Sequence, residues 1–310
     1  MTAMPVIQVH DVHKSYEDVH AVRGVSFDVA HGEVFCLLGP NGAGKTTIAE
    51  ILEGHRLPTS GGVSVLGHDP ARGERALRDR IGVVLQSGGM QDELTVGELL
   101  EMHGRWYSRS LTPDQLIGLV ELDAKRDTRT GDLSGGQRRR LDLALGLVGD
   151  PDVLFLDEPT TGFDPHARRA AWSTIRSLCS TGKTVFLTTH FMDEAQYLAD
   201  RVAVMVDGEI VASGPPEALG GRDQLPTEIR FVLPGGVTAG ELPAMAGCAV
   251  SEERGQVLIT TAHGIAATHL ISGWALERTL ELERFSVSQP TLEDVYLALT
   301  DSTTPVEAPR

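Results

Sequence analysis

A glycine-rich segment near the amino terminus carries the clearest chemical signal in this sequence. Residues 39–46 read Gly39-Pro40-Asn41-Gly42-Ala43-Gly44-Lys45-Thr46 and match the pattern G-x-x-x-x-G-K-S/T at every position. Glycines permit positive φ, which lets successive backbone N–H groups face one anion. Lys45 adds a full positive charge for the β- and γ-phosphates, and Thr46 offers a hydroxyl to Mg²⁺. We therefore predict a nucleoside triphosphate site here, against the alternative of a glycine turn with an exposed lysine.

A pair of acidic residues further along the chain suits the same chemistry. Asp157 closes the apolar run 153–156, and Glu158 follows it. Ligands of open α/β sheets bind outside the carboxyl ends of the strands. We expect Asp157 to hold Mg²⁺ together with Thr46, directly or through water, and Glu158 to deprotonate the water that attacks the γ-phosphate. The alternative is two solvated acids before Pro159, which a complete phosphate loop in the same chain disfavours.

The elements around these residues alternate between strand and helix. Short apolar runs predict strands over 6–9, 22–29, 34–38, 61–67, 81–85, 153–156 and 184–189. Apolar residues three and four apart predict helices from Thr47, over 94–122, over 141–148 and over 165–179. Trp106 and Tyr107 in the second of these helices are predicted core residues. This alternation indicates a layered α/β domain.

A second, smaller domain is predicted after Pro215 and Pro216. The glycines 220 and 221 mark the boundary, and the runs 228–233 and 257–260 predict strands of an α+β domain over roughly 223–287. A last helix is expected after Pro290, where Thr291 and Asp294 can form a capping box. The polar segment 301–310 is predicted to be a disordered tail.

Composition excludes several classes of function. A formal net charge of −16 over 310 residues argues against general affinity for nucleic acid or anionic lipid. We find no apolar run near the ~18 residues that cross a bilayer and no signal-peptide pattern, so a membrane role has to come through a partner. Cys36, Cys179 and Cys248 form no C-x-x-C pair, and the first two lie in apolar segments. Cys36 and Cys179 are predicted to be buried, reduced thiols of a cytosolic protein.

A third motif turns these features into an ordered set. Residues 133–137, Leu-Ser-Gly-Gly-Gln, match letter for letter the signature motif of the ABC (ATP-binding cassette) transporters. The order of phosphate loop, Gln86, signature, Asp157-Glu158 and His190 fits as well. Over residues 6–219 the chain therefore resembles the nucleotide-binding subunit of an ABC transporter. The resemblance implies an α/β P-loop NTPase cassette, with a RecA-like core and a helical subdomain at about 94–148, followed by a small α+β accessory domain over 223–300.

The resemblance also implies roles for individual residues, with ATP and Mg²⁺ as cofactors. Glu158 would be the catalytic base, His190 would bridge the γ-phosphate, and Gln86 would contact Mg²⁺ and the attacking water. The implied metal contacts are Thr46, Gln86 and Asp157. The implied nucleotide contacts are Tyr16, which would stack on adenine, Gly39, Pro40, Asn41, Gly42, Ala43, Gly44, Lys45, Thr46, Thr47, Ser134, Gly135, Gly136, Gln137 and Asp164.

Several of these residues have ordinary structural interpretations. Tyr16 is also compatible with a turn tyrosine, and His190 with a histidine that ends a strand. Asp164 precedes Pro165 and is a good helix N-cap, a role compatible with an interface contact. Phe163 departs from the leucine usual at its place in the family.

The resemblance extends to partners. In this family the signature of one subunit faces the phosphate loop of another, so Ser134, Gly135 and Gly136 would contact the γ-phosphate in trans. This implies a head-to-tail homodimer with ATP at the interface and an integral-membrane permease as partner. The chain would lie on the cytoplasmic face of the membrane through that permease, and no nucleic acid is expected as a partner.

Further segments are similar to exporter ATPases of the daunorubicin-resistance type. They are residues 35–38, 190–195 and 289–297. They imply export of the multidrug kind, with the cargo itself left open among drug, lipid, polysaccharide and peptide.

Two other functions stay open at this point. A soluble ABC-type ATPase could act on ribosomes or nucleic acid without a permease, and Arg138-Arg139-Arg140 is the best feature for it. Three arginines that open a helix usually form a solvated face, however, and the 88 residues from Thr46 to Leu133 leave no room for a long coiled coil. A nucleotide switch in regulation or assembly is the other alternative.

Overall fold

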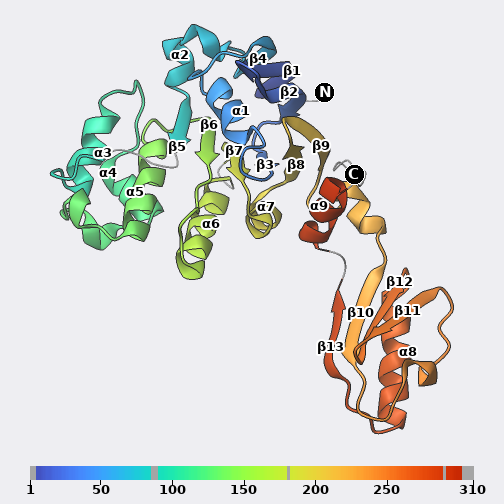
Figure 1. The fold of residues 1–310 in the computed structure, drawn as a ribbon. Helices are drawn as coiled ribbons and strands as arrows, with labels where there is room; N and C mark the ends of the chain where they lie inside the picture. The colour runs from blue at the N-terminus through green and yellow to red at the C-terminus, as the bar shows by residue number, and fades with distance from the viewer. Residues whose placement is uncertain (1–4, 85–89, 180–181, 289–290, 302–310) are drawn as a thin grey trace. The chain divides into compact units, whose positions relative to one another are not determined.

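The computed structural model describes residues 5–84, 90–179, 182–288 and 291–301. The chain divides into two compact units, Met1–Pro216 and Glu217–Arg310. The elements of both units are labelled in Figure 1.

The first unit is a mixture of strands and helices. Its 3₁₀ turns lie at Pro70–Arg72, Asp123–Lys125 and Thr130–Asp132. Its strands and α-helices are, in chain order, β1 (Ile7–Tyr16), β2 (Val19–Val29), β3 (Val34–Leu38), α1 (Lys45–Leu52), β4 (Ser60–Val65), α2 (Arg75–Arg78), β5 (Ile81–Val84), α3 (Val96–Gly104), α4 (Pro113–Leu119), α5 (Gly135–Leu147), β6 (Val153–Asp157), α6 (Pro165–Cys179), β7 (Thr184–Thr189), α7 (Met192–Leu198), β8 (Arg201–Val206) and β9 (Glu209–Gly214).

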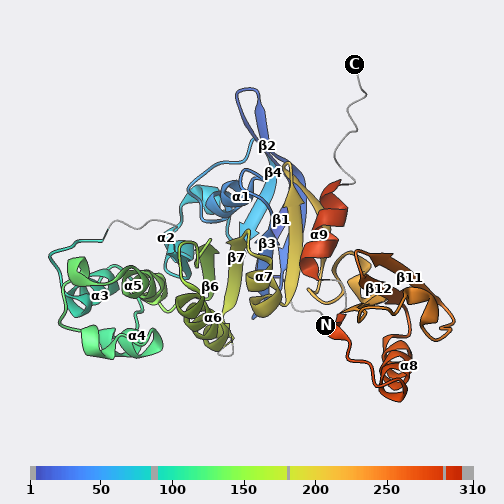
Figure 2. The same ribbon diagram turned by 60° about the horizontal axis from the view of Figure 1, so that its bottom comes forward.

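A six-stranded sheet of order β5-β6-β7-β3-β8-β9 forms the centre of this unit among the described residues. Its strands pair in parallel except for β9, which is antiparallel to β8. Every residue of β3, β6 and β7 is buried, as expected for parallel strands covered on both faces. Because β7 lies between β3 and β6, the carboxyl ends of these strands are neighbours (Figure 2).

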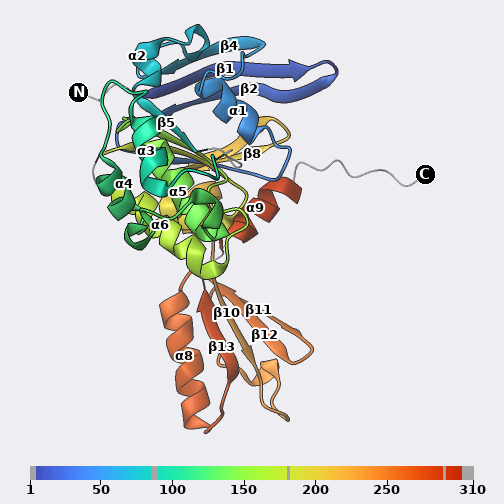
Figure 3. The ribbon, with the colours of Figure 1, turned by 90° about the vertical axis from the view of Figure 1, so that its left-hand side faces the viewer.

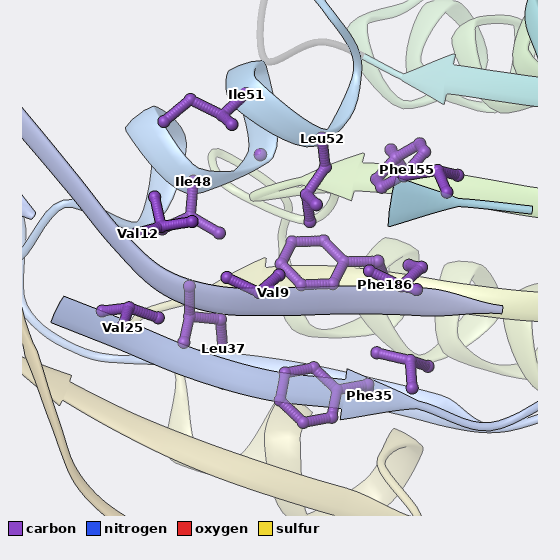
Figure 4. Packing of buried hydrophobic residues seen from close by; sticks show 14 of the residues in the cluster. Val9, Val12, Val25, Phe35, Leu37, Ile48, Ile51, Leu52, Phe155 and Phe186 are labelled. Carbon is purple, nitrogen blue, oxygen red and sulfur yellow. The ribbon is translucent and has the colours of Figure 1, made fainter. Parts of the chain in front are cut away.

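A separate antiparallel sheet of order β2-β1-β4 packs with α1 against the central sheet. Val9, Val12 and Val25 from this sheet share one hydrophobic cluster with Phe155 and Phe186 (Figure 4). The rings of Phe27 and Phe35 stack with centroids 4.8 Å apart, and those of Phe35 and Phe186 with centroids 5.9 Å apart. This core anchors both ends of the glycine-rich loop, since β3 precedes the loop and α1 follows it.

The predicted strands over 34–38 and 184–189 and the helix over 165–179 are confirmed. The single helix predicted over 94–122 is wrong, because α3 ends at Gly104 and α4 begins only at Pro113. The prediction that Trp106 is a core residue is also wrong: its side chain is 61% exposed. Trp106 follows the end of α3 and therefore leaves the apolar stripe of that helix. Tyr107, which is half-buried, packs its ring against Gly149.

The second unit is a small antiparallel sheet with helices. Its four strands have the order β11-β12-β10-β13, and α8 packs against one face of the sheet (Figure 3). Ile229, Phe231, Ile271 and Trp274 belong to its core. Its elements are 3₁₀ turns at Leu219–Gln224 and Ala239–Glu241, β10 (Thr227–Val232), β11 (Cys248–Glu253), β12 (Gln256–Thr261), α8 (Gly264–Glu277), β13 (Glu283–Ser288) and α9 (Leu292–Asp301).

The capping box at the start of α9 is confirmed. The Asp294 N–H donates to Thr291 Oγ1 at 3.1 Å, and the Thr291 N–H donates to Asp294 Oδ2 at 2.6 Å. Helix α9 runs to Asp301, one residue into the predicted tail, and residues 302–310 lie outside the described residues. The strands β11 and β13 were not predicted, because their apolar patterns are weak.

None of the helices within the described ranges combines the length and the apolar character needed to span a membrane. The cysteines are free thiols, of which Cys36 is buried as predicted while Cys179 is only half-buried. Burial raises the pKa of Cys179 to about 11.

Candidate active site

The glycine-rich loop turns from the end of β3 into α1. Gly42 and Gly44 take positive φ, 85° and 102°, and Gly44 is the N-cap of α1. A Cβ atom at Gly44 would lie 2.3 Å from the carbonyl oxygen of Ala21, and one at Gly39 would lie 2.2 Å from that of Met205. The loop is therefore pressed against backbone on both sides, and only glycine fits at these two positions.

We expect Gly44→Ala to lower the unfolding free energy by roughly 2–5 kcal/mol, from positive φ together with overpacking. The matched control is Gly67→Ala, because Gly67 also has positive φ, 80°, but a Cβ there would meet nothing within 4 Å. The control should lose only about 1–2 kcal/mol. Urea unfolding of both variants measures the difference, and equal losses would contradict the role assigned to the close contact.

Lys45 reaches back across this loop from the first turn of α1. Its Nζ donates to the carbonyl oxygens of Gly39 at 2.9 Å and Pro40 at 3.0 Å, and lies 3.7 Å from Glu158 Oε1. The residue is only 4% exposed. Burial lowers its pKa, while the negative charges of Glu158 and Asp157 act in the opposite direction. The ammonium is thus held inside the loop, where a phosphate oxygen can replace a carbonyl partner.

Asp157 at the end of β6 joins the loop to the neighbouring strand. Its Oδ2 accepts a hydrogen bond from Thr46 Oγ1 at 3.2 Å, and its Oδ1 accepts one from Thr188 Oγ1 on β7. Oxygen ligands at about 2.1 Å on adjacent corners of a Mg²⁺ octahedron lie about 3 Å apart. The Thr46 and Asp157 oxygens therefore fit a shared Mg²⁺, which supports the predicted metal contacts of these two residues.

Several contacts hold Glu158 beside the phosphate loop. Its φ is +47°, a left-handed conformation that is strained for a residue with a side chain. The Glu158 N–H donates to the backbone oxygen of Thr188 at 3.0 Å, and Oε2 accepts from Thr161 Oγ1 at 3.1 Å. His190 Nδ1 lies 3.2 Å from Oε1, at ion-pair distance but not aligned as a hydrogen bond. Together these contacts hold the Glu158 carboxylate beside Lys45 and His190.

Lys45, Thr46 and Glu158 line a cavity of about 340 Å³. The same cavity is lined by Asn41 and Gly42 of the loop. A helix N-terminus, a lysine and a carboxylate thus face one space, which suits a polyphosphate and a water molecule activated beside it.

The signature residues form a different site. Ser134 caps α5: its Oγ accepts from the Gln137 N–H at 3.3 Å, and its own N–H donates to Gln137 Oε1 at 3.0 Å. Ser134 and Gly135 are exposed, and a Cβ at Gly135 would meet nothing within 4 Å. Within the described residues, the cavities that Ser134, Gly135 and Gly136 line share no residue with the cavity at the phosphate loop.

The chain is similar to known proteins over 69% of its length. A family model described as ABC transporter matches residues 22–161. The Nod factor export ATP-binding protein I of Rhizobium sp. (strain N33) is 47% identical over 218 residues, which cover 69% of this chain and 72% of that protein. The chain belongs to the ABC transporter family of ATP-binding proteins. The protein of the same name from Paraburkholderia xenovorans (strain LB400) is 46% identical over 219 residues, 69% of this ABC protein and 72% of the relative.

Solved structures confirm the predicted cassette fold. The cbiO1 protein of Clostridium perfringens, part of the ABC transporter complex cbiONQ, superposes with a TM-score of 0.62 at 28% identity, covering 69% of this ABC protein and 89% of that chain. A dimeric ATP-binding cassette bound to ADP and Pi matches with a TM-score of 0.61 at 24% identity, over 67% and 98% of the two chains. A second family model, for an ABC transporter-like C-terminal domain, matches residues 227–291.

The other predicted site residues of this ABC protein lie in several places. Tyr16 ends β1 and is half-buried rather than exposed, with Lys14 Nζ 5.0 Å and Arg56 Cζ 5.1 Å from its ring centroid. Asp164 caps α6, since its Oδ1 accepts from the Ala167 N–H at 2.9 Å, as its N-cap interpretation predicts. Gln86 lies outside the described residues. Thr47 follows Thr46 in α1 and lines the phosphate-loop cavity.

Two residues of the ABC protein at this site were missed by sequence reasoning. Thr188 bonds both Asp157 and the Glu158 N–H, and the only signal was a hydroxyl near the end of a predicted strand, two residues before His190. Arg139 donates to the carbonyl oxygens of Pro159 at 2.9 Å and Glu158 at 3.4 Å. Its signal was the arginine triplet, whose place at the start of a helix favours a solvated face.

Proposed function

We propose that this chain is the ATP-binding and ATP-hydrolysing subunit of an ABC exporter. The observation that carries the proposal is that Lys45, Thr46 and Glu158 line one cavity, with Asp157 bonded to Thr46 and His190 lying 3.2 Å from Glu158. Because the chain belongs to the ABC transporter family, we infer that the nucleotide is ATP. Export is supported by relatives at 46–47% identity that are named as Nod factor export ATP-binding proteins.

In the proposed reaction each residue has a separate task. The loop N–H groups and the Lys45 ammonium bind the β- and γ-phosphates, whose negative charge the ammonium offsets. Glu158 accepts a proton from the attacking water, and this proton transfer raises the nucleophilicity of the water. His190, whose Nδ1 lies 3.2 Å from Glu158 Oε1, keeps that carboxylate beside the bound γ-phosphate.

The proposal includes a divalent metal at Thr46 and Asp157. When bound there, Mg²⁺ would neutralise phosphate charge as bond cleavage proceeds. Thr188 orients the Asp157 carboxylate by donating to Oδ1. Gln86 stays in the proposal as a further contact to the metal and the attacking water.

We further propose a head-to-tail homodimer with ATP between the subunits. Ser134 and Gly135 are exposed at the N-terminus of α5, and Ser134, Gly135 and Gly136 line cavities separate from the phosphate loop of their own chain. A helix N-terminus is an anion site, so Ser134, Gly135, Gly136 and Gln137 suit the γ-phosphate of ATP held by a partner. Tyr16 would stack on the adenine, and Asp164 would lie at the interface.

The ATPase would act on a separate integral-membrane permease, with the chain on the cytoplasmic side of the membrane. The cassette would span 6–219 with its helical subdomain at about 94–148, and residues 223–300 would form an accessory domain. A soluble ABC ATPase that acts on ribosomes or nucleic acid, or a pure nucleotide switch, is not favoured because the relatives are named for export.

Co-expression with a candidate permease, a multi-span membrane protein sought among the neighbouring reading frames, tests this function. We expect the two chains to co-purify in detergent and the complex in vesicles to hydrolyse ATP faster than the isolated chain. Nuclease treatment is the control and should change nothing. A chain that stays in the soluble fraction and whose ATP hydrolysis depends on RNA or ribosomes would contradict the export function.

A further inference from the structure

The arginine triplet at the start of α5 is not a solvated face. Each arginine donates to backbone carbonyl oxygens of a different loop. Arg138 donates to Thr130 at 3.2 Å, and Arg140 to Glu121 at 3.2 Å. Arg139 alone reaches the catalytic segment, at Pro159 and Glu158. The triplet therefore connects the signature helix to three parts of the first unit. One of these contacts reaches the backbone oxygen of Glu158, the proposed base.

The Arg139 side chain is buried where it contacts these carbonyl oxygens. This side chain is 10% exposed, and it forms an ion pair of 3.7 Å with Asp142 one turn along the same helix. Burial lowers its pKa, which Asp142 offsets in part. A guanidinium stays charged at neutral pH and presents donors in a fixed fork, so it can hold two carbonyl oxygens at once.

The two carbonyls belong to a strained turn. Glu158 has φ of +47°, and its N–H is held from the other side by the backbone and hydroxyl oxygens of Thr188. The peptide units on both sides of the Glu158 Cα are thus fixed, one by β7 and the other by α5. Left-handed backbone at a residue with a side chain persists only where its surroundings enforce it. Loss of the α5 contact would let Glu158 relax away from the cavity.

We propose that Arg139 is a positioning residue that holds Glu158 and links the signature helix to it. The inference rests on the proposed function. In the proposed dimer, the signature of one chain contacts ATP in one site while Glu158 of that chain serves the other site. Arg139 therefore connects the two ATP sites through a single side chain, and occupation of one site bears on hydrolysis in the other.

Steady-state ATP hydrolysis by the full chain tests the inference. We expect Arg139→Gln to lower kcat about tenfold or more, the effect of losing charge-assisted hydrogen bonds, with KM for ATP changed less than about twofold. The Hill coefficient for ATP should fall toward 1. Arg139→Lys restores a cation that reaches one carbonyl and should recover part of kcat.

The matched control is Arg109→Gln, which likewise removes a donation to a backbone carbonyl oxygen, that of Asp150 at 2.6 Å, and should leave kcat near that of the wild type. Thermal unfolding and ATP-dependent dimer formation of Arg139→Gln in a Glu158→Gln background report whether fold and binding are kept. Wild-type kcat in Arg139→Gln, an equal loss in Arg109→Gln, or an unchanged Hill coefficient would overturn the inference. A wild-type chain without turnover would instead overturn the proposed function, and is recognised before any variant is measured.

Discussion

We expect the Glu158→Gln variant to lose ATP hydrolysis by about 10²–10⁴-fold while it still binds ATP. The amide keeps the shape of the side chain but cannot accept a proton from water. Because Oε1 lies 3.7 Å from Lys45 Nζ, removal of this negative charge also strengthens the hold of the lysine on phosphate. The ATP-bound state should therefore accumulate, together with the proposed dimer.

Single-turnover hydrolysis and gel filtration with ATP measure both effects. Glu209→Gln provides a control, since Glu209 is exposed at the start of β9. This variant should hydrolyse ATP at the wild-type rate. Full activity in Glu158→Gln would show that another group accepts the proton. Loss of ATP binding in this variant would show that the carboxylate is structural.

The second large effect is expected for Lys45→Ala, which should weaken ATP binding by about 100-fold or more. This corresponds to roughly 3 kcal/mol, the value of a charge-assisted hydrogen bond to phosphate in a buried site. Lys45 is the cation whose Nζ bonds Gly39 and Pro40 across the loop, so the change also removes an internal brace. Fluorescent nucleotide titration measures the loss.

Lys183→Ala separates these two roles. Lys183 Nζ likewise donates to a backbone carbonyl, that of Pro151 at 2.8 Å, and to Asp150 Oδ1 at 2.6 Å, but it does not line the phosphate-loop cavity. This variant should lose stability and keep its ATP affinity. Wild-type affinity in Lys45→Ala, or equal losses of affinity in the two variants, would contradict phosphate binding by Lys45.

Much of the site could be predicted because its signals are local. The phosphate loop needs a buried strand, glycines and a helix in direct succession, and all three are visible between Val34 and Leu52. Asp157 follows the same logic, since a carboxylate that ends an apolar run emerges at the end of a buried strand. The capping residues Ser134 and Thr291 depend only on a partner three residues later.

Non-local features were predicted poorly. Trp106 was assigned to the core because its spacing continues the pattern of α3, but the helix stops before it. The strands β11 and β13 have few buried residues, so alternation did not mark them. Arg139 was interpreted as solvated because burial of a helix face depends on what packs against it.

The amino-acid sequence by itself determined the family, the phosphate loop, the acidic pair and the signature helix, since each is a run of neighbouring residues. Only the tertiary structure decided how they meet. The placement of β7 between β3 and β6 brings Thr188 to Asp157 and Glu158, and the packing of α5 brings Arg139 to the same turn. These contacts join residues 19 to 31 positions apart, and strand order and helix packing, which local spacing does not encode, set their geometry.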